Sequence, residues 1–327
     1  MPAPRRAAFG LLPALATLAA TRPVSAAEGD YPNRPIRLVV PFIAGGSVDL
    51  LSRAVAQALG KELGKTVAVE NRPGGTTVIG TTYVARSAPD GYTLLSGADS
   101  VELNRYLMAS LPYDPDRDLV PILKLADVPY VLVVNSRLPV QSLQDLIAHA
   151  KARSGELTYA SFGIGGVGHL SGELLARMAG IEILHIPYPG NPPALLDVAA
   201  GRVAMMFCTI PLALPELQSG RVRAVAMSSP RRVPVLAEVP TLAEAGLPGY
   251  AATSQMVLYA PGGVSPEIVR RLNAATRRAM GDPDFTRLLD AQGFVLAQPR
   301  SAEEIAAMIR KHTARWAEVI RAAGIHL

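Results

Sequence analysis

The sequence predicts an α/β protein of two lobes, each built on a mostly parallel sheet flanked by helices. Two observations predict this class. Strand and helix patterns alternate along the chain, and one order of elements (strand, glycine loop, helix, strand) occurs twice. Strands that alternate with helices form right-handed βαβ units on a parallel sheet. Two separate sets of such units therefore indicate two lobes.

The first set of elements begins at residue 36. In order, it consists of a strand (36–40), a glycine loop (41–47), a helix (49–59), a strand (66–70), a turn (71–75), a helix ending near residue 87 and a strand (92–95). The strands are short apolar runs, and the first helix has its apolar residues on one side, with Gly60 as its expected end. The turn follows from the Pro73-Gly74-Gly75 cluster.

The same order returns in the second half of the chain. This set consists of a strand (157–160), a glycine loop (161–168), a helix (169–178), a strand (181–186), a turn (187–192), a helix (193–200) and a strand (203–207). Gly180 and Gly201 are the expected ends of its two helices. The repetition of the order is the reason for predicting a second lobe.

Four further helices are predicted from residues typical of helix starts. These starts are a capping-box variant at 142–145, Pro266, Pro283 and a cap at 301–304. The last helix carries an apolar stripe that includes Trp316, which we interpret as simple packing.

The N-terminal residues predict a secretory signal peptide over residues 1–26. Arg5 and Arg6 form a basic start, a short uncharged apolar run follows, and small residues at 24–26 suit a signal peptidase. The apolar run is short for a membrane span, which needs about 20 residues. We therefore expect an exported protein.

Composition and charge exclude several classes of protein. The formal charge of +5 falls to +2 (5 − 3) once the three arginines of the signal peptide are removed. With no long basic run and only 5% aromatic residues, nucleic acid is not an expected partner. Cys208 is the only cysteine, so no intrachain disulfide can form. The five histidines lack metal-ligand spacing, and we expect neither a metal nor a cofactor.

The two glycine loops, Phe42–Ser47 and Ser161–Gly168, are the expected ligand site. Each follows a strand and leads into a helix, and ligands of parallel sheets bind outside the carboxyl ends of the strands. Free N–H groups and the positive end of the helix dipole favour an anion there. Glycine lets the backbone approach the ligand, so bulk at Gly45 or Gly165 should block binding and leave the fold intact.

Enzymatic alternatives have little support in the sequence. Residues 163–168 match G-x-G-x-x-G, but the acidic residue of a dinucleotide site is missing, since Glu182 comes too early. No nucleophile elbow or zinc-protease motif is present. A secreted hydrolase that uses Cys208 or Asp99 stays open as an alternative, although nothing orients such a nucleophile.

With these motifs in order, the chain resembles the Bug-type substrate-binding receptors of the tripartite tricarboxylate transporter family. The stretches that carry the resemblance are Tyr31-Pro32, 35–42, Gly45-Gly46 with Asp49, 69–74, 88–95, 111–115, His169-Leu170 with 172–174, Pro187-Tyr188 with Gly190, and 239–241 with 244–250. They extend over the whole mature chain, and the ordered set is far more specific than any one motif.

The resemblance implies a periplasmic binding protein of the type II-like flytrap class that holds a small carboxylate between its lobes. It implies residues 27–130 and 251–327 as the first lobe and 131–250 as the second, with hinges at 130–134 and 251–256. The implied partners are a small organic acid or amino acid-like ligand and a two-component membrane permease, which some relatives lack. We expect a monomer.

We expect ligand contacts from both glycine loops and from neighbouring strand ends. The residues are Phe42, Ala44, Gly45, Gly46, Ser47, Gly97, Ala98, Asp99, Ser161, Phe162, Gly163, Gly165, Gly166, His169, Tyr188, Cys208 and Gln255. The sequence departs from the family pattern at Ile43, Asp99, Pro189, Cys208 and 255–256, all of which are expected to face the cleft. We expect these departures to change the identity of the ligand and not the fold. A ligand-sensing receptor for a signalling partner would need the same flytrap and stays open.

The signal-peptide interpretation predicts a mature N-terminus near Ala27. Edman or mass-spectrometric sequencing of periplasmic protein should find that residue first, because signal peptidase cleaves after small residues. Periplasmic material that still contains residues 11–18 would contradict it.

Overall fold

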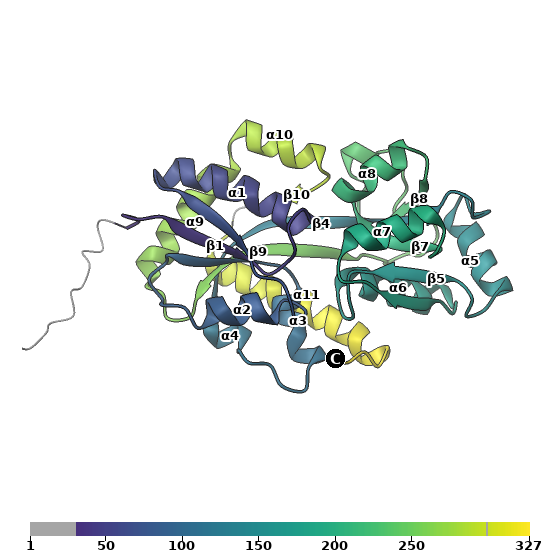
Figure 1. Cartoon of the computed structure of the whole chain (residues 1–327), viewed down its shortest axis with the longest axis horizontal. Coiled ribbons are helices and arrows are strands. Elements are labelled where there is room, and N and C mark those ends of the chain that lie inside the picture. The colour runs from purple at the N-terminus through teal and green to yellow at the C-terminus, as the bar shows by residue number, and fades with distance from the viewer. Residues whose placement is uncertain (1–30, 299) are drawn as a thin grey trace, which may run out of the picture. The chain divides into compact units, whose positions relative to one another are not determined.

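The computed structural model describes residues 31–298 and 300–327, and their strands form one continuous hydrogen-bonded set flanked by helices (Figure 1). The predicted signal peptide and its cleavage site lie outside the described residues. Among the described helices, none is both long enough and apolar enough to cross a membrane.

The strands and helices follow the predicted alternation. The strands are β1 (Ile36–Val40), β2 (Val67–Asn71), β3 (Thr93–Gly97), β4 (Leu119–Asn135), β5 (Thr158–Ser161), β6 (Leu184–Pro187), β7 (Met205–Thr209), β8 (Val222–Met227), β9 (Thr253–Pro261) and β10 (Val295–Leu296). The helices are α1 (Ser47–Leu63), α2 (Val78–Ala85), α3 (Ser100–Leu107), α4 (Pro115–Asp118), α5 (Leu143–Ala152), α6 (Val167–Ala179), α7 (Asn191–Ala200), α8 (Ile210–Gln218), α9 (Pro266–Met280), α10 (Pro283–Ala291) and α11 (Ala302–Ala322).

The strands lie in the order β2-β1-β3-β9-β4-β7-β5-β6, and β8 and β10 also pair with β4. We call β1, β2, β3, β9 and β10 with the first part of β4 the first sheet, and β5–β8 with the rest of β4 the second sheet. The βαβ units are parallel in both sheets, as predicted. However, β4 and β9 run antiparallel to their neighbours, so each sheet is mixed.

Strand β4 joins the two sheets and was not predicted. Up to Pro129 it pairs with β9, and from Tyr130 onward it pairs with β7. Two prolines and two shifts in register interrupt the alternation of its first half, which hides the strand in the sequence. The predicted hinge at 130–134 thus falls where β4 changes partner, and it stays a prediction.

The second half of β4 sends alternate side chains into two hydrophobic clusters, as the period of a strand requires. Tyr130, Leu132 and Val134 enter a cluster formed with α5, α6 and the end of α11. Val131 and Val133 enter a cluster formed with α7 and α8. The second sheet is therefore buried on both faces.

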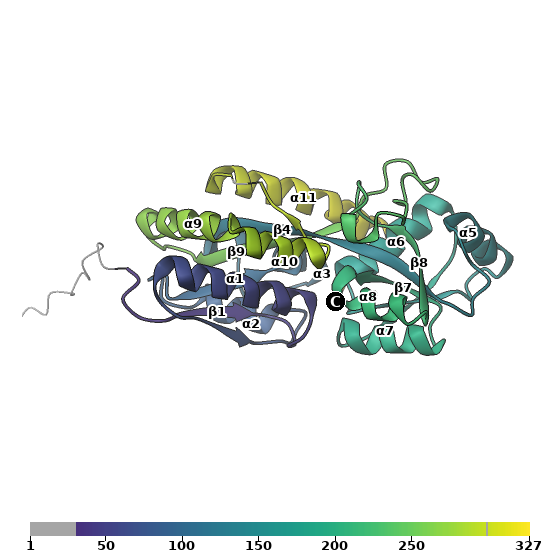
Figure 2. The same cartoon turned by 90° about the horizontal axis from the view of Figure 1, so that it is seen from above.

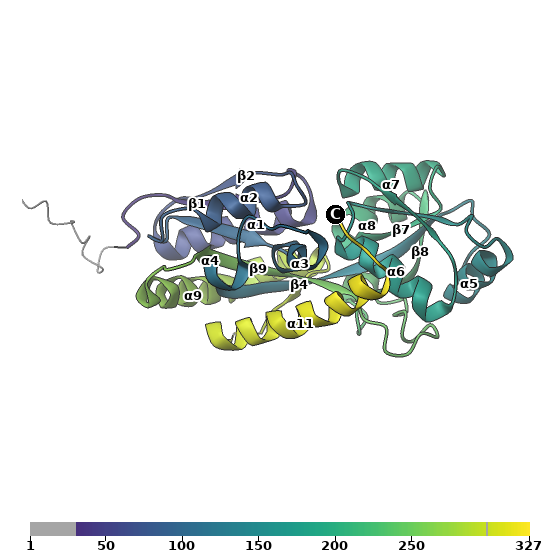
Figure 3. The same cartoon turned by 90° about the horizontal axis from the view of Figure 1, so that it is seen from below.

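Helices cover both faces of the first sheet as well. Figure 1 shows α1, α9 and α10 on one side of its strands, and α2, α3, α4 and α11 on the other. Figure 2 shows the same layers from above. Helix α11 runs along both sheets (Figure 3) and contacts α3 and α6. Its Trp316 is buried in the cluster of the second sheet, which agrees with the predicted packing role.

Most predicted helix boundaries agree with the structure to within a few residues. The capping boxes at Ser142 and Ser301 are both present. The expected end of α1 at Gly60 is wrong, because the helix continues to Leu63. Gly64 ends it instead, since its φ of 63° is left-handed and its N–H bonds to carbonyls of the last turn.

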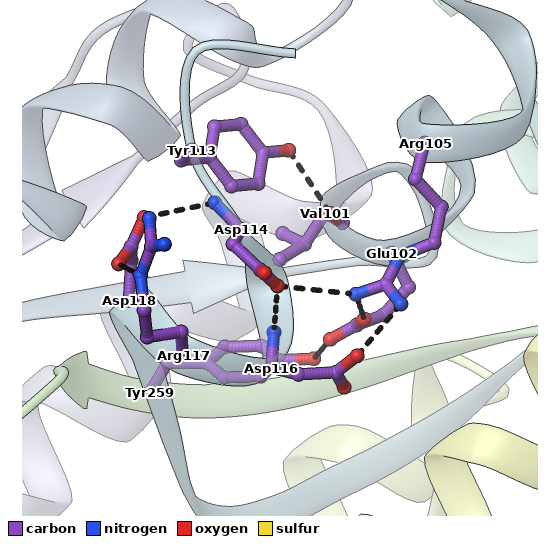
Figure 4. A network of polar contacts seen from close by, with 9 residues as sticks. All are labelled: Val101, Glu102, Arg105, Tyr113, Asp114, Asp116, Arg117, Asp118 and Tyr259. Carbon is purple, nitrogen blue, oxygen red and sulfur yellow. Dashed lines mark hydrogen bonds and ion pairs between the residues drawn. The ribbon is translucent and has the colours of Figure 1, made fainter.

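A network of polar contacts lies between α3, α4 and β9, in which Glu102 and Tyr259 are buried and Asp116 is exposed (Figure 4). The Glu102 carboxylate lies 3.8 Å from the Arg105 guanidinium and accepts a long 3.5 Å hydrogen bond from the Tyr259 hydroxyl. Arg105 also forms a 2.7 Å ion pair with Asp116. Burial raises the pKa of Glu102 to about 7, and the nearby Arg105 offsets this only in part.

Glu102→Gln should make the free energy of unfolding depend less on pH between pH 5 and pH 8. The native state holds the Glu102 proton up to about pH 7, whereas the ordinary pKa is 4.5, so the free energy of unfolding falls as pH rises through this window. The glutamine has no proton to lose. The variant should therefore gain stability over the wild type between pH 5 and pH 8 by roughly 3 kcal/mol.

Urea titrations at the two pH values measure this change, with the exposed Glu267→Gln as the control for removal of a carboxylate. Parallel stability curves for wild type and Glu102→Gln would contradict the shifted pKa of Glu102.

Candidate ligand-binding site

A cavity of about 380 Å³ opens where the strands of the two sheets end. Its walls include the loops that follow β1, β2 and β3 and the loops that follow β5, β6 and β7. Its volume lies within the usual range for small-molecule sites. The carboxyl ends of six parallel strands thus surround one space, which is the geometry expected of a ligand site in such sheets.

Six helices begin at this cavity, and no side chain caps any of them. They are α1, α2, α3, α6, α7 and α8, whose N-terminal residues line the cavity and whose N-cap residues are Gly46, Thr77, Asp99, Gly166, Gly190 and Thr209. The first N–H groups of a helix have no partner within the helix. Helix dipoles add positive potential at the same point.

The five α-helices that begin elsewhere in the described chain are all capped. Their N-cap side chains, which accept a backbone N–H, are Asp114, Ser142, Ser265, Asp282 and Ser301. None of these residues lines the cavity. Side-chain caps are therefore missing only where a ligand could replace them.

The six helix starts do not offer equal numbers of N–H groups. Helices α7 and α8 carry prolines in their first turn, which have no N–H. At α2 the N–H groups of Val78 and Ile79 bond to carbonyls of the preceding turn, and at α3 those of Val101 and Glu102 bond to the carbonyls of Ala98 and Asp99. Helices α1 and α6 have no proline in the first turn and a glycine as N-cap. The two glycine loops therefore hold the richest sets of donors, one on each sheet.

The first glycine loop is held in place by Asp49. Its carboxylate accepts hydrogen bonds from the Gly45 N–H (2.9 Å), from Arg53 (2.9 Å) and from Asn71 (2.9 Å), and Asn71 also donates to the Phe42 carbonyl. Burial tends to raise the pKa of Asp49, but the hydrogen bonds from Arg53, Gly45 and Asn71 outweigh it and hold the pKa below its ordinary value. Asp49 and Asn71 thus support the loop, while Phe42, Gly46 and Ser47 line the cavity.

The second glycine loop rests on two stacked histidines. The Gly165 N–H donates to His169 Nδ1 (3.0 Å), and the His169 ring stacks on the His185 ring with centroids 3.8 Å apart. His185 Nε2 lies 2.7 Å from the Ser161 hydroxyl. Burial lowers the pKa of His169 to about 3, helped by His185, and that of His185 to about 4. Both rings are therefore neutral supports at ordinary pH.

The structure brings ten of the expected contact residues to the cavity wall. They are Phe42, Gly46, Ser47, Ala98, Asp99, Phe162, Gly163, Gly165, Gly166 and Tyr188. The other seven do not line it, namely Ala44, Gly45, Gly97, Ser161, His169, Cys208 and Gln255. Four of the positions that depart from the family pattern lie in the wall, namely Ile43, Asp99, Pro189 and Met256.

The positions of Cys208 and Gln255 follow from the period of a strand. Thr209 lines the cavity, and Cys208 before it points into the cluster under α7 and α8. Ser254 and Met256 line the cavity, and Gln255 between them is buried elsewhere. In both places it is the neighbouring residue that lines the cavity, because alternate residues of a strand point to opposite sides.

Several polar wall residues were missed in the sequence. They are Thr76, Thr77, Ser100, Asn191, Thr209 and Ser254. Three of them, Ser100, Asn191 and Thr209, stand at the junction between a strand and a helix without a glycine pair beside them.

The expected effect of bulk at Gly45 needs a correction. Gly45 has a φ of 80°, a conformation that a β-branched residue adopts only with strain, so Gly45→Val would disturb the loop itself. Gly46 has an ordinary φ of −77°, and an added Cβ would meet only the Ile43 carbonyl at 3.7 Å. Substitutions at Gly46 therefore probe the cavity more cleanly.

Comparison with known proteins identifies a single family. The sequence model of the family TctC, described as "Tripartite tricarboxylate transporter family receptor", matches residues 51–325. The chain is 40% identical over 325 residues to a protein of Bordetella pertussis named BugT, with 98% of each chain covered.

Two solved structures of similar fold contain a bound carboxylate. The structure described as "R. palustris Rpa4515 with adipate" has a TM-score of 0.86 and 37% identity, and the match covers 91% of this chain and 99% of that one. MatC from Rhodopseudomonas palustris with bound malate has a TM-score of 0.81 and 32% identity, with 89% and 100% covered.

Cys208 should be unreactive in the folded protein. The side chain is fully buried, and burial raises the pKa of the thiol, whereas only the thiolate is a good nucleophile. Ellman's reagent should react with Cys208 at least about a hundredfold more slowly in buffer than in 8 M urea, as expected when labelling waits for unfolding. If the reagent labelled the native protein quickly and adipate prevented this labelling, the thiol would lie in the cavity instead.

Proposed function

The chain belongs to the tripartite tricarboxylate transporter receptor family, so it is a solute-binding protein, and we propose that its solute is a small carboxylate held between the two lobes. The observation that carries this proposal is the set of six uncapped helix N-termini around one cavity. Buried N–H groups need acceptors. A carboxylate supplies several acceptor oxygens and a charge that the helix dipoles favour.

The wall itself supports an anion bound by backbone groups. Its residues include no lysine, arginine or histidine, and Asp99 is the single carboxylate among them. Binding through N–H groups needs no cationic side chain, as at other helix N-termini that hold anions. Phe42, Tyr130 and Phe162 supply apolar surface for the body of the ligand. The adipate and malate in the two similar structures are ligands of this class.

The proposal includes closure of two lobes on the ligand. The lobes would divide near Tyr130 in β4 and near residue 251, with the hinges at 130–134 and 251–256. Contacts already cross the cavity, since the Ser47 hydroxyl donates to the Thr209 hydroxyl (2.5 Å). Loops from both sheets can therefore touch one small molecule at the same time, which is how hinged binding proteins enclose a ligand.

The proposed function also includes the place where the protein works and its membrane partner. A signal peptide over residues 1–26 would deliver a monomeric receptor to the periplasm, where it would present its ligand to a two-component membrane permease. Growth and uptake of labelled adipate by a strain that lacks this receptor, compared with the complemented strain, test the transport role.

Gly46→Asp should abolish carboxylate binding without harm to the fold. The backbone of Gly46 is already that of an N-cap, so an aspartate there can accept the free N–H groups of α1. It would then occupy the donors and repel the ligand. We expect the affinity for adipate to fall at least about a hundredfold, as one nearby like charge can achieve. The free energy of unfolding should change by less than about 0.5 kcal/mol or rise.

Titration calorimetry and thermal melting measure the two effects. The matched control is Ser265→Asp, which places the same charge at the N-cap of α9, away from the cavity. Unchanged adipate affinity in Gly46→Asp would remove the N-terminus of α1 from the site.

A further inference from the structure

Asp99 is the only side chain of the cavity wall with a formal charge, and its environment is unusual for an anion site. It is the N-cap residue of α3 but caps no N–H of that helix. It is 4% exposed. A bare carboxylate at this position would repel a bound carboxylate and attract an ammonium group.

Both oxygens of Asp99 are occupied by groups of the protein. Oδ2 accepts hydrogen bonds from the Ser254 hydroxyl and from the Gln255 N–H (3.1 Å), both on β9. Oδ1 lies 2.5 Å from Nε2 of His312 on α11. Donors or acceptors from β9 and α11 therefore occupy both oxygens, so neither oxygen is left free for a ligand.

The contact with His312 requires a proton between the two groups. An oxygen and a nitrogen approach to 2.5 Å only when one of them donates. The His312 ring is fixed in this place by Trp316, whose indole meets it edge-on with centroids 6.2 Å apart and whose Nε1–H donates to Nε2 (3.0 Å), so Nε2 is an acceptor. The side chain of His312 is 22% exposed and that of Asp99 is 3% exposed, so water screens the pair little on the Asp99 side.

We propose that Asp99 and His312 form a pair without net charge, and that His312 thereby sets the ligand class as carboxylates that lack an ammonium group. This inference rests on the proposed function of the cavity. With the pair neutral, the partial positive charges of the helix N-termini act on the ligand unopposed. Without the imidazole, Asp99 would keep a negative charge beside the ligand, and amino acids would be favoured over plain diacids.

The test compares adipate with 2-aminoadipate, which have the same chain length and differ by one ammonium group. Calorimetry on the wild type should show tighter binding of adipate. His312→Gln should weaken adipate binding at least about tenfold, because an unpaired like charge then faces it, and should shift the ratio of the two affinities towards 2-aminoadipate. In the double variant Asp99→Asn/His312→Gln the charge is gone, and the ratio should return to the wild-type preference.

The control is His149→Gln on α5, which removes an imidazole far from the cavity and should change neither affinity. Unchanged ligand preference in His312→Gln, or a double variant that still behaves like His312→Gln, would overturn the proposal. Melting curves of each variant check that the fold is intact.

A second measurement does not depend on the ligand. Nitrogen-15 and carboxyl carbon-13 NMR of the ligand-free wild type at pH 7 should show Asp99 holding the shared proton beside a neutral His312 ring, because Nε2 already accepts from Trp316, and Asp99→Asn should change the His312 signals. A His312 ring with one bare nitrogen beside an ionised Asp99 would overturn the neutral pair even if adipate binds. A wild type that binds no dicarboxylate, with the neutral pair present, would refute the proposed function and leave the pair standing.

Discussion

Unpaired backbone N–H groups at the helix starts are the constraint on which the arrangement of this protein depends. Six α-helices begin at one cavity without a side-chain cap, while the described α-helices that start elsewhere use a serine or aspartate cap. A buried donor without an acceptor costs free energy, so a bound acceptor would be stabilised at these helix starts, as the proposed function requires. Its low content of charged side chains follows from this, since the backbone already supplies the positive potential.

The cavity keeps its shape through side chains that do not line it. Asn71 and His169 hold the two glycine loops from behind by hydrogen bonds to backbone groups. Such outer contacts fix where the ligand-facing N–H groups point. The two sheets are linked by β4, whose pairing changes from β9 to β7 within one residue, and by α11, which contacts α3 and α6. Any relative movement of the lobes must therefore pass through these elements.

Local patterns in the sequence were sufficient for the fold class and for the two glycine loops. Apolar runs of five residues identified β1, and serine-led capping boxes identified the starts of α5 and α11. They failed for β4, where prolines and shifts in register break the alternation. They also failed for the end of α1, because Gly60 fits inside the helix as well as Gly64 fits its end.

The sequence by itself determined the family resemblance, the order of elements and the strand ends near which the cavity lies, because these depend on short-range periodicity and on turn residues. Only the tertiary structure decided which side chains face the cavity. A shift of one residue along a strand reverses the side to which a side chain points, as Cys208 and Thr209 show. Likewise, only the packing of α11 against the first sheet brings His312 to Asp99, 213 residues away in the chain.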